Sequence, residues 1–276
     1  WMREFIWQGL HFICRREPCI LRNKRLRGQC SFRVRAALLF CQNHDIAIGS
    51  RGRAVSVERL GEIFLELKEK GAANINLVTG AHYVPQIIEA LDMARRKGLD
   101  IPVVYNSSGY EKTETLKLLE GYVDIYLPDL KYLDPELAQK FSNAPDYVQA
   151  AKAAIGEMVR QTGKCEFGED GYIRKGTIVR HLILPGHTGN SIKALRYLHE
   201  TYGEDIYISI MNQYTPVRKF VEFKELNRKV TKREYEKVLD AAVDMGIQNG
   251  FIQEGETASE SFIPDFDYEG VEKNTP

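Results

Sequence analysis

The sequence predicts an α/β protein built from parallel βα units, and three observations support this class. Short apolar stretches typical of buried strands alternate with segments whose apolar residues recur every three or four positions. Six such strands are recognisable, almost all separated by a predicted helix, which favours parallel pairing with right-handed crossovers. No G-x-G-x-x-G follows the first strand, so a dinucleotide-binding sheet loses support. A full or partial barrel and an open doubly wound sheet both stay possible.

Helix boundaries follow from capping residues. Ser56 can cap the first helix and Gly71 ends it, while Pro85 opens the second and Gly98 closes it. Asp134 precedes a proline suited to a first helical position. Later helices are expected at about 113–120, 146–161, 191–202 and 232–245, the last with a capping box of Thr231 and Glu234.

The strands read as short, largely apolar runs bounded by turn residues. They are expected at 74–79, 101–105, 123–127, 178–184, 206–211 and 247–252. Glu169-Asp170-Gly171 predicts a turn between two short polar strands. Residues after Pro264 read as an acidic tail.

The composition is that of a globular protein, with 43% hydrophobic and 28% charged residues in 276. No apolar run approaches the roughly 18 residues that a membrane span needs. The first residues also lack the order of a secretory signal. A cytoplasmic location without a membrane partner is therefore expected.

The first 39 residues resist a fold interpretation. Residues 1–40 carry nine Lys or Arg and two acids, although the whole chain has zero formal net charge. A solvated tail is the plain interpretation, and nucleic-acid contact is disfavoured because no recognition module accompanies the charge. The five cysteines form no C-x-x-C and four lie in the first 41 residues, which suggests a metal site and no more.

Polar side chains follow nearly every predicted strand. In a parallel barrel these ends gather on one face, where functional groups collect. Asp129 and Lys131 flank Leu130 and should share a face, either as an exposed ion pair of little worth or as a grip on a zwitterionic ligand. His82 alone reads more as a structural histidine than as a ligand. The polar segments are 79–82, 106–109, Asp129 with Lys131, His187, 212–214 and 253–254.

Several motifs resemble a branch of the radical S-adenosylmethionine (SAM) proteins related to pyruvate formate-lyase activating enzymes. The resemblance runs in order from about Phe40 to Asp267. The motifs that carry it are Asn74-Ile75-Asn76-Leu77-Val78-Thr79, Val104-Tyr105-Asn106-Ser107-Ser108-Gly109-Tyr110, Tyr126-Leu127-Pro128-Asp129-Leu130-Lys131-Tyr132, Val179-Arg180-His181-Leu182-Ile183-Leu184-Pro185-Gly186, Met211-Asn212-Gln213-Tyr214-Thr215-Pro216 and Phe262-Ile263-Pro264-Asp265-Phe266.

The resemblance implies a partial (β/α)6 barrel, TIM-like and parallel, that holds a [4Fe–4S] cluster and SAM. Three cysteines spaced C-x3-C-x2-C would ligate three irons, and SAM would bind the fourth and be cleaved to a 5′-deoxyadenosyl radical. A reductant such as flavodoxin or ferredoxin and a protein or peptide substrate are the implied partners. Cys41 matches the third cysteine, and the matched SAM-binding positions are Thr79, His82, Asn106, Ser108, Asp129 and Lys131.

The chain departs from this pattern at the other two cysteine positions. Counting back from Cys41 places them at 34 and 38, where the sequence has Val34 and Leu38. Together with the charge imbalance and the start at Trp1, this predicts a truncated or mistranslated basic leader over 1–39, a radical SAM barrel over 40–267 and a tail over 268–276. The chain is expected to be impaired. The alternative is a cluster-free binding protein that retains the barrel.

The sequence does not name the substrate. Four polar residues at strand ends lie beyond the positions matched to SAM, and they are the expected substrate contacts: Arg180, Asn212, Gln213 and Tyr214. Of these, Tyr214, like Met211, reads more as a packing residue than as a reacting one.

Overall fold

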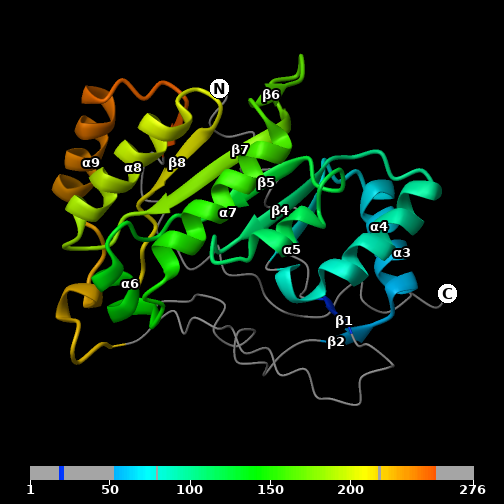
Figure 1. The fold of residues 1–276 in the computed structure, drawn as a ribbon, viewed down its shortest axis with the longest axis horizontal. Coiled ribbons are helices and arrows are strands. Elements are labelled where there is room, and N and C mark those ends of the chain that lie inside the picture. The colour runs from blue at the N-terminus through cyan, green and yellow to red at the C-terminus, as the bar shows by residue number, and fades with distance from the viewer. Residues whose placement is uncertain (1–18, 22–52, 79, 217–218, 253–276) are drawn as a thin grey trace.

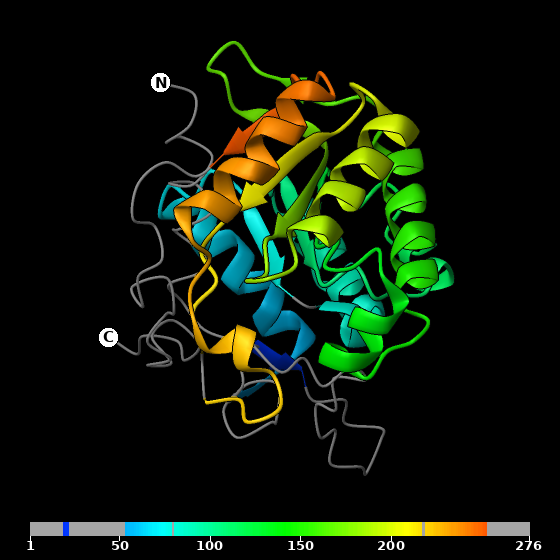
Figure 2. The same ribbon diagram turned by 90° about the vertical axis from the view of Figure 1, so that its left-hand side faces the viewer.

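A curved, mostly parallel sheet with helices on its outer face forms the molecule (Figures 1 and 2). The computed structural model describes residues 19–21, 53–78, 80–216 and 219–252. Within them the main sheet has seven strands in the order β3-β4-β5-β7-β8-β9, and β6 pairs with β7 alone, antiparallel. The sheet described does not close on itself, because β3 and β9 stand at opposite ends of the strand order. The expected α/β fold of an incomplete parallel barrel is confirmed.

The strands and helices alternate as the sequence indicates. A short parallel pair, β1 and β2, is separate from the main sheet. The strands are β1 (Cys19–Leu21), β2 (Arg53–Val55), β3 (Ile75–Val78), β4 (Val103–Ser107), β5 (Ile125–Pro128), β6 (Glu166–Phe167), β7 (Ile173–Leu182), β8 (Tyr207–Met211) and β9 (Gly250–Ile252). The helices are α3 (Val57–Glu69), η1 (Gly80–Tyr83), α4 (Val84–Arg96), α5 (Thr113–Lys117), α6 (Pro135–Ser142), α7 (Tyr147–Thr162), α8 (Thr188–Tyr202), η2 (Lys224–Asn227) and α9 (Lys232–Asp244).

The capping residues stabilise the helix ends as their sequence positions predict. The Ser56 hydroxyl accepts a hydrogen bond from the Arg59 N–H at 3.1 Å. Thr231 and Glu234 form the full capping box at the start of α9. These caps satisfy N–H groups that have no partner within the helix.

None of the described helices is long and apolar enough to cross a membrane.

Some boundaries differ from those expected. β7 begins at Ile173 rather than 178, because its first residues also form the predicted hairpin with β6. The last strand covers only Gly250–Ile252, and β1 lies in the leader, where three residues are too few to show a period. The expectations for Cys41, Thr79 and the acidic tail lie outside the described residues.

The two faces of the sheet have different chemistry because successive side chains alternate. Ile75 and Leu77 of β3 pack outward into a core with α3 and α4, whereas Asn76 points to the inner face. A second large core lies under α6, α7, α8 and α9. The inner face has a small apolar cluster of Val104, Ile125, Leu127 and Ile178. The inner face is therefore less apolar than the outer one and is polar toward the carboxyl ends of its strands.

Candidate functional site

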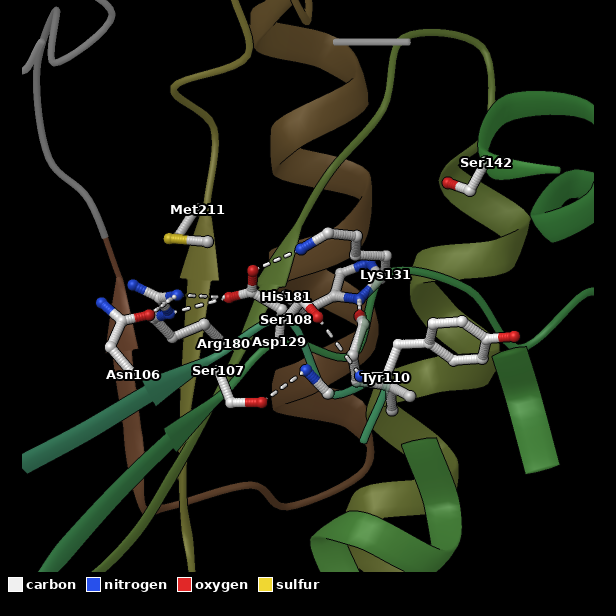
Figure 3. A network of polar contacts seen from close by, with 12 residues as sticks. Asn106, Ser107, Ser108, Tyr110, Asp129, Lys131, Ser142, Arg180, His181 and Met211 are labelled. Atoms are coloured by element: carbon white, nitrogen blue, oxygen red, sulfur yellow. Dashed lines mark hydrogen bonds and ion pairs between the residues drawn. The ribbon is translucent and has the colours of Figure 1, made fainter. Parts of the chain in front are cut away.

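The carboxyl ends of β4, β5 and β7 bring three polar side chains together (Figure 3). Asp129 forms a parallel bridge with Arg180, and its N–H donates to the Ser107 carbonyl at 2.9 Å. The three strands thus stay paired up to the residues where their loops begin. Asn106, Asp129 and Arg180 converge on one side of the sheet as a result (Figure 3).

Asp129 is the centre of this site, which we call the Asp129 cluster (Asn106, Asp129, Lys131 and Arg180). Arg180 donates from Nε to Asp129 Oδ1 at 2.8 Å and from Nη2 to Asn106 Oδ1 at 2.7 Å. The Lys131 ammonium pairs with the other carboxylate oxygen. These contacts join side chains from three strands into one network.

The charges of the cluster are shielded but not sealed from water. The Asp129, Lys131 and Arg180 side chains are 18%, 15% and 23% exposed. Burial alone would raise the pKa of the Asp129 carboxyl, but Arg180 and Lys131 outweigh it and hold that pKa below its ordinary value. One carboxylate therefore stands between two cations, and the site carries a net positive charge at neutral pH.

The loop after β4 has a defined shape. Ser107 Oγ accepts from the Gly109 N–H at 3.0 Å and donates to the half-buried Glu111 carboxylate, whose pKa is raised by its burial. Gly109 has a φ of +77°, and a Cβ there would lie 2.2 Å from the Asp129 carbonyl oxygen. Only glycine fits this approach, which holds the loop against the end of β5. Ser108 is left exposed beside the cluster.

His181 supports the cluster from the outer face of β7. Its side chain is fully buried, and burial lowers its pKa to about 4, so the ring is neutral at pH 7. Nδ1 lies 2.6 Å from the Leu130 carbonyl oxygen, which can only accept, so Nδ1 carries the proton. Nε2 then accepts from Ser191 Oγ at 2.9 Å. The ring ties β7 and α8 to the segment between Asp129 and Lys131.

The inner face also has polar atoms without partners. Asn76 is 6% exposed, and among the residues that the structure describes neither its Oδ1 nor its Nδ2 has a hydrogen-bond partner. The buried Asn74 Oδ1 atom also has no hydrogen-bond partner among the described residues. Buried amides are normally paired, so these atoms suit contact with a polar group that the described residues do not supply.

The remaining predicted residues lie at varied positions. His82 is exposed on η1, and Asn212 and Gln213 are half-buried directly after β8. Tyr214 is buried and donates from its hydroxyl to the Leu226 carbonyl at 2.8 Å, so its ring and hydroxyl are engaged in the core. Arg180, a predicted substrate contact, donates hydrogen bonds to Asp129 and Asn106, and its role toward a substrate stays a prediction.

The described residues form an incomplete parallel barrel of the α/β class, with charged side chains gathered at the carboxyl ends of its strands. The model of the radical SAM superfamily matches residues 39–198 of this chain. The chain belongs to this superfamily, whose members use a [4Fe–4S] cluster and SAM.

A curated relative is the uncharacterized protein MJ0674 of Methanocaldococcus jannaschii, 26% identical over 220 residues. The match covers 77% of this chain and 59% of that protein, so the chain spans well under two thirds of its relative's length. SuiB of Streptococcus suis, solved with its precursor peptide SuiA, shares the fold with a TM-score of 0.54 and 14% identity, covering 82% of this chain and 48% of SuiB. HydG, a maturase of the [FeFe]-hydrogenase, has a TM-score of 0.53 at 13% identity, covering 83% and 52%.

The two cofactors fit the chain differently. SAM carries an amine and a carboxylate, and the Asp129 cluster presents one carboxylate and two cations within one site. The residues at the expected ligand positions do not fit the [4Fe–4S] cluster. Val34 and Leu38 stand where two cysteines are expected, and hydrocarbon side chains cannot ligate iron. Within the ranges that the structure describes, which leave out Cys14, Cys30 and Cys41, no group of three or more His, Cys, Asp or Glu side chains could hold a metal ion.

Proposed function

We propose that the Asp129 cluster binds the methionyl end of SAM. The observation that carries this proposal is a carboxylate held between Arg180 and Lys131 at the carboxyl ends of parallel strands. Asp129 would receive the SAM amine, and Lys131 would donate its remaining N–H groups to the SAM carboxylate. Asn106 and Ser108 would line the same ligand from β4, with His82 and Thr79 as further contacts from the segment after β3.

We infer further that the architecture serves the family's reaction on a protein or peptide. That reaction is the reductive cleavage of SAM to a 5′-deoxyadenosyl radical; a [4Fe–4S] cluster, if bound, would supply the electron, and a partner such as flavodoxin or ferredoxin would be its source. SuiB, which shares the fold, was solved with a precursor peptide, and this supports a peptide substrate here by likeness of fold alone. Asn212 and Gln213 are the best placed of the proposed substrate contacts, because Tyr214 is buried.

This chain is proposed to be impaired in that reaction, because the sequence supplies one of three expected cysteines. The competing function is a cluster-free protein that keeps the barrel and the SAM site. Anaerobic iron–sulfur reconstitution separates the two when it is applied to the chain and to a Val34→Cys, Leu38→Cys variant. We expect no cluster on the chain itself.

Iron–sulfur absorbance and SAM cleavage in the double variant would support a radical SAM enzyme that is impaired by the two missing cysteines. Iron-free protein in both, with SAM still bound, would favour the cluster-free function. About four irons per unaltered chain would contradict the account of the leader, because some other residues would then be ligands.

A further inference from the structure

A tyrosine on a neighbouring helix bonds to the backbone on which the Asp129 cluster is built. Tyr147 is the first residue of α7, and its side chain is buried against the loops after β4 and β5. Its hydroxyl accepts from the Lys131 N–H at 2.9 Å. It lies 2.9 Å from the Asp129 carbonyl oxygen and 3.2 Å from the Ser108 carbonyl oxygen, to which its single proton can be donated.

The position of this hydroxyl is fixed by its surroundings. The Tyr147 ring packs edge-on against Tyr132, with ring centroids 5.4 Å apart, and at a tilt against Tyr110, at 5.8 Å. Tyr110 is itself held by Asp146, the residue that precedes α7, at 2.6 Å. Burial raises the pKa of Tyr147 well above its ordinary value, so the hydroxyl keeps the proton that it donates.

These contacts control the geometry of the ligand-binding side chains. The Asp129 carbonyl and the Lys131 N–H lie on either side of Leu130, so one hydroxyl that bonds both fixes the backbone between the two charged side chains. The contact with the Ser108 carbonyl holds the loop after β4 against the same Tyr147 hydroxyl. Gly109 permits the loop to approach Asp129, since a Cβ there would clash with the Asp129 carbonyl oxygen.

We propose that Tyr147 is a positioning residue for the SAM site, acting through the backbone that orients Asp129 and Lys131. This inference rests on the proposed function. Tyr147 does not touch the ligand in this account. Its hydroxyl sets the separation and direction of the carboxylate and the ammonium, which must meet the amine and carboxylate of one ligand within a small tolerance.

The test compares two tyrosines that are both buried. Tyr147→Phe removes the hydroxyl that joins the loops, whereas Tyr132→Phe removes a buried hydroxyl whose hydrogen-bond partner, among the described residues, is Ser142 at 2.9 Å. The full chain of each is titrated with SAM by calorimetry, and amide hydrogen exchange is followed at Lys131. Tyr147→Phe should weaken SAM binding about tenfold and speed exchange at Lys131, while Tyr132→Phe should change affinity by less than about twofold.

A double variant shows whether the effect passes through Lys131. If it does, Tyr147→Phe with Lys131→Ala should bind SAM no more than about twofold more weakly than Lys131→Ala alone, because coupled residues are not additive. Equal losses from the two Phe variants, or full additivity, would overturn the positioning role and leave Tyr147 a structural residue. A wild-type chain that binds no SAM would overturn the proposed function, and this inference with it.

Discussion

Replacing Asp129 with asparagine removes the one negative charge of the cluster while keeping the shape of the side chain. Arg180 and Lys131 then face each other without a carboxylate between them. Exposed ion pairs contribute about 0–1 kcal/mol, whereas removing one partner of a fully buried pair costs about 3–5 kcal/mol. The side chains here are 15–23% exposed, so the cost lies between these limits, at about 2 kcal/mol.

The stability difference between the wild type and Asp129→Asn should depend on pH in a defined way. The pKa of Asp129 is lowered in the folded protein, so its contribution is fully present above the unfolded pKa of about 4 and is lost as pH falls through the folded pKa. The difference should therefore be constant from about pH 7 to 5 and shrink below about pH 4.

Thermal unfolding of both proteins across this range provides the assay. A cost of about 2 kcal/mol corresponds to a Tm lower by about 4–8 °C at pH 7 in a protein of this size. Equal stabilities at pH 7, or a difference that grows on acidification, would refute the assignment of Asp129 as a shielded carboxylate between two cations.

Three further outcomes follow from the same geometry. Gly109→Ala should destabilise the fold by at least about 1 kcal/mol in urea unfolding, because a Cβ would meet the Asp129 carbonyl at a positive φ; an unchanged midpoint would contradict that approach. The Tm of His181→Asn should fall less than that of the wild type between pH 7 and 5. The buried neutral ring, with its pKa of about 4, loses its stabilising contribution in the wild type as pH falls below about 6.5. Parallel plots of Tm against pH would show that the ring is not held neutral. Asn76→Leu should raise Tm, since an amide with no hydrogen-bond partner among the described residues is replaced by an apolar group. A lower Tm would show that Asn76 has a structural partner.

Local signals in the sequence predicted much of the fold. Ser56, Asp134 and the Thr231–Glu234 capping box mark helix starts that the structure confirms, because capping depends on residues two or three positions apart. The spacing of Asp129 and Lys131 predicted that they share a face, and the two side chains do pair. Patterns of this kind need no knowledge of the tertiary structure.

Contacts across the sheet were beyond such reasoning. Arg180 lies 51 residues from Asp129, and their pairing depends on the register between β5 and β7, which no local pattern encodes. The sequence predicted Arg180 as a substrate contact and did not predict its pairing with Asp129. Tyr147 gave no signal at all, because it acts from a helix through backbone atoms. A buried tyrosine at a helix start reads as a packing residue.

The most direct test of the account is a calorimetric titration of SAM into the chain and into its Asp129→Asn and Lys131→Ala variants. We expect one SAM per chain for the wild type and binding at least about tenfold weaker for each variant, because each loses a charge-assisted contact. Wild-type binding that neither substitution weakens would place SAM elsewhere. No binding by the folded wild-type chain would contradict the proposed SAM site itself.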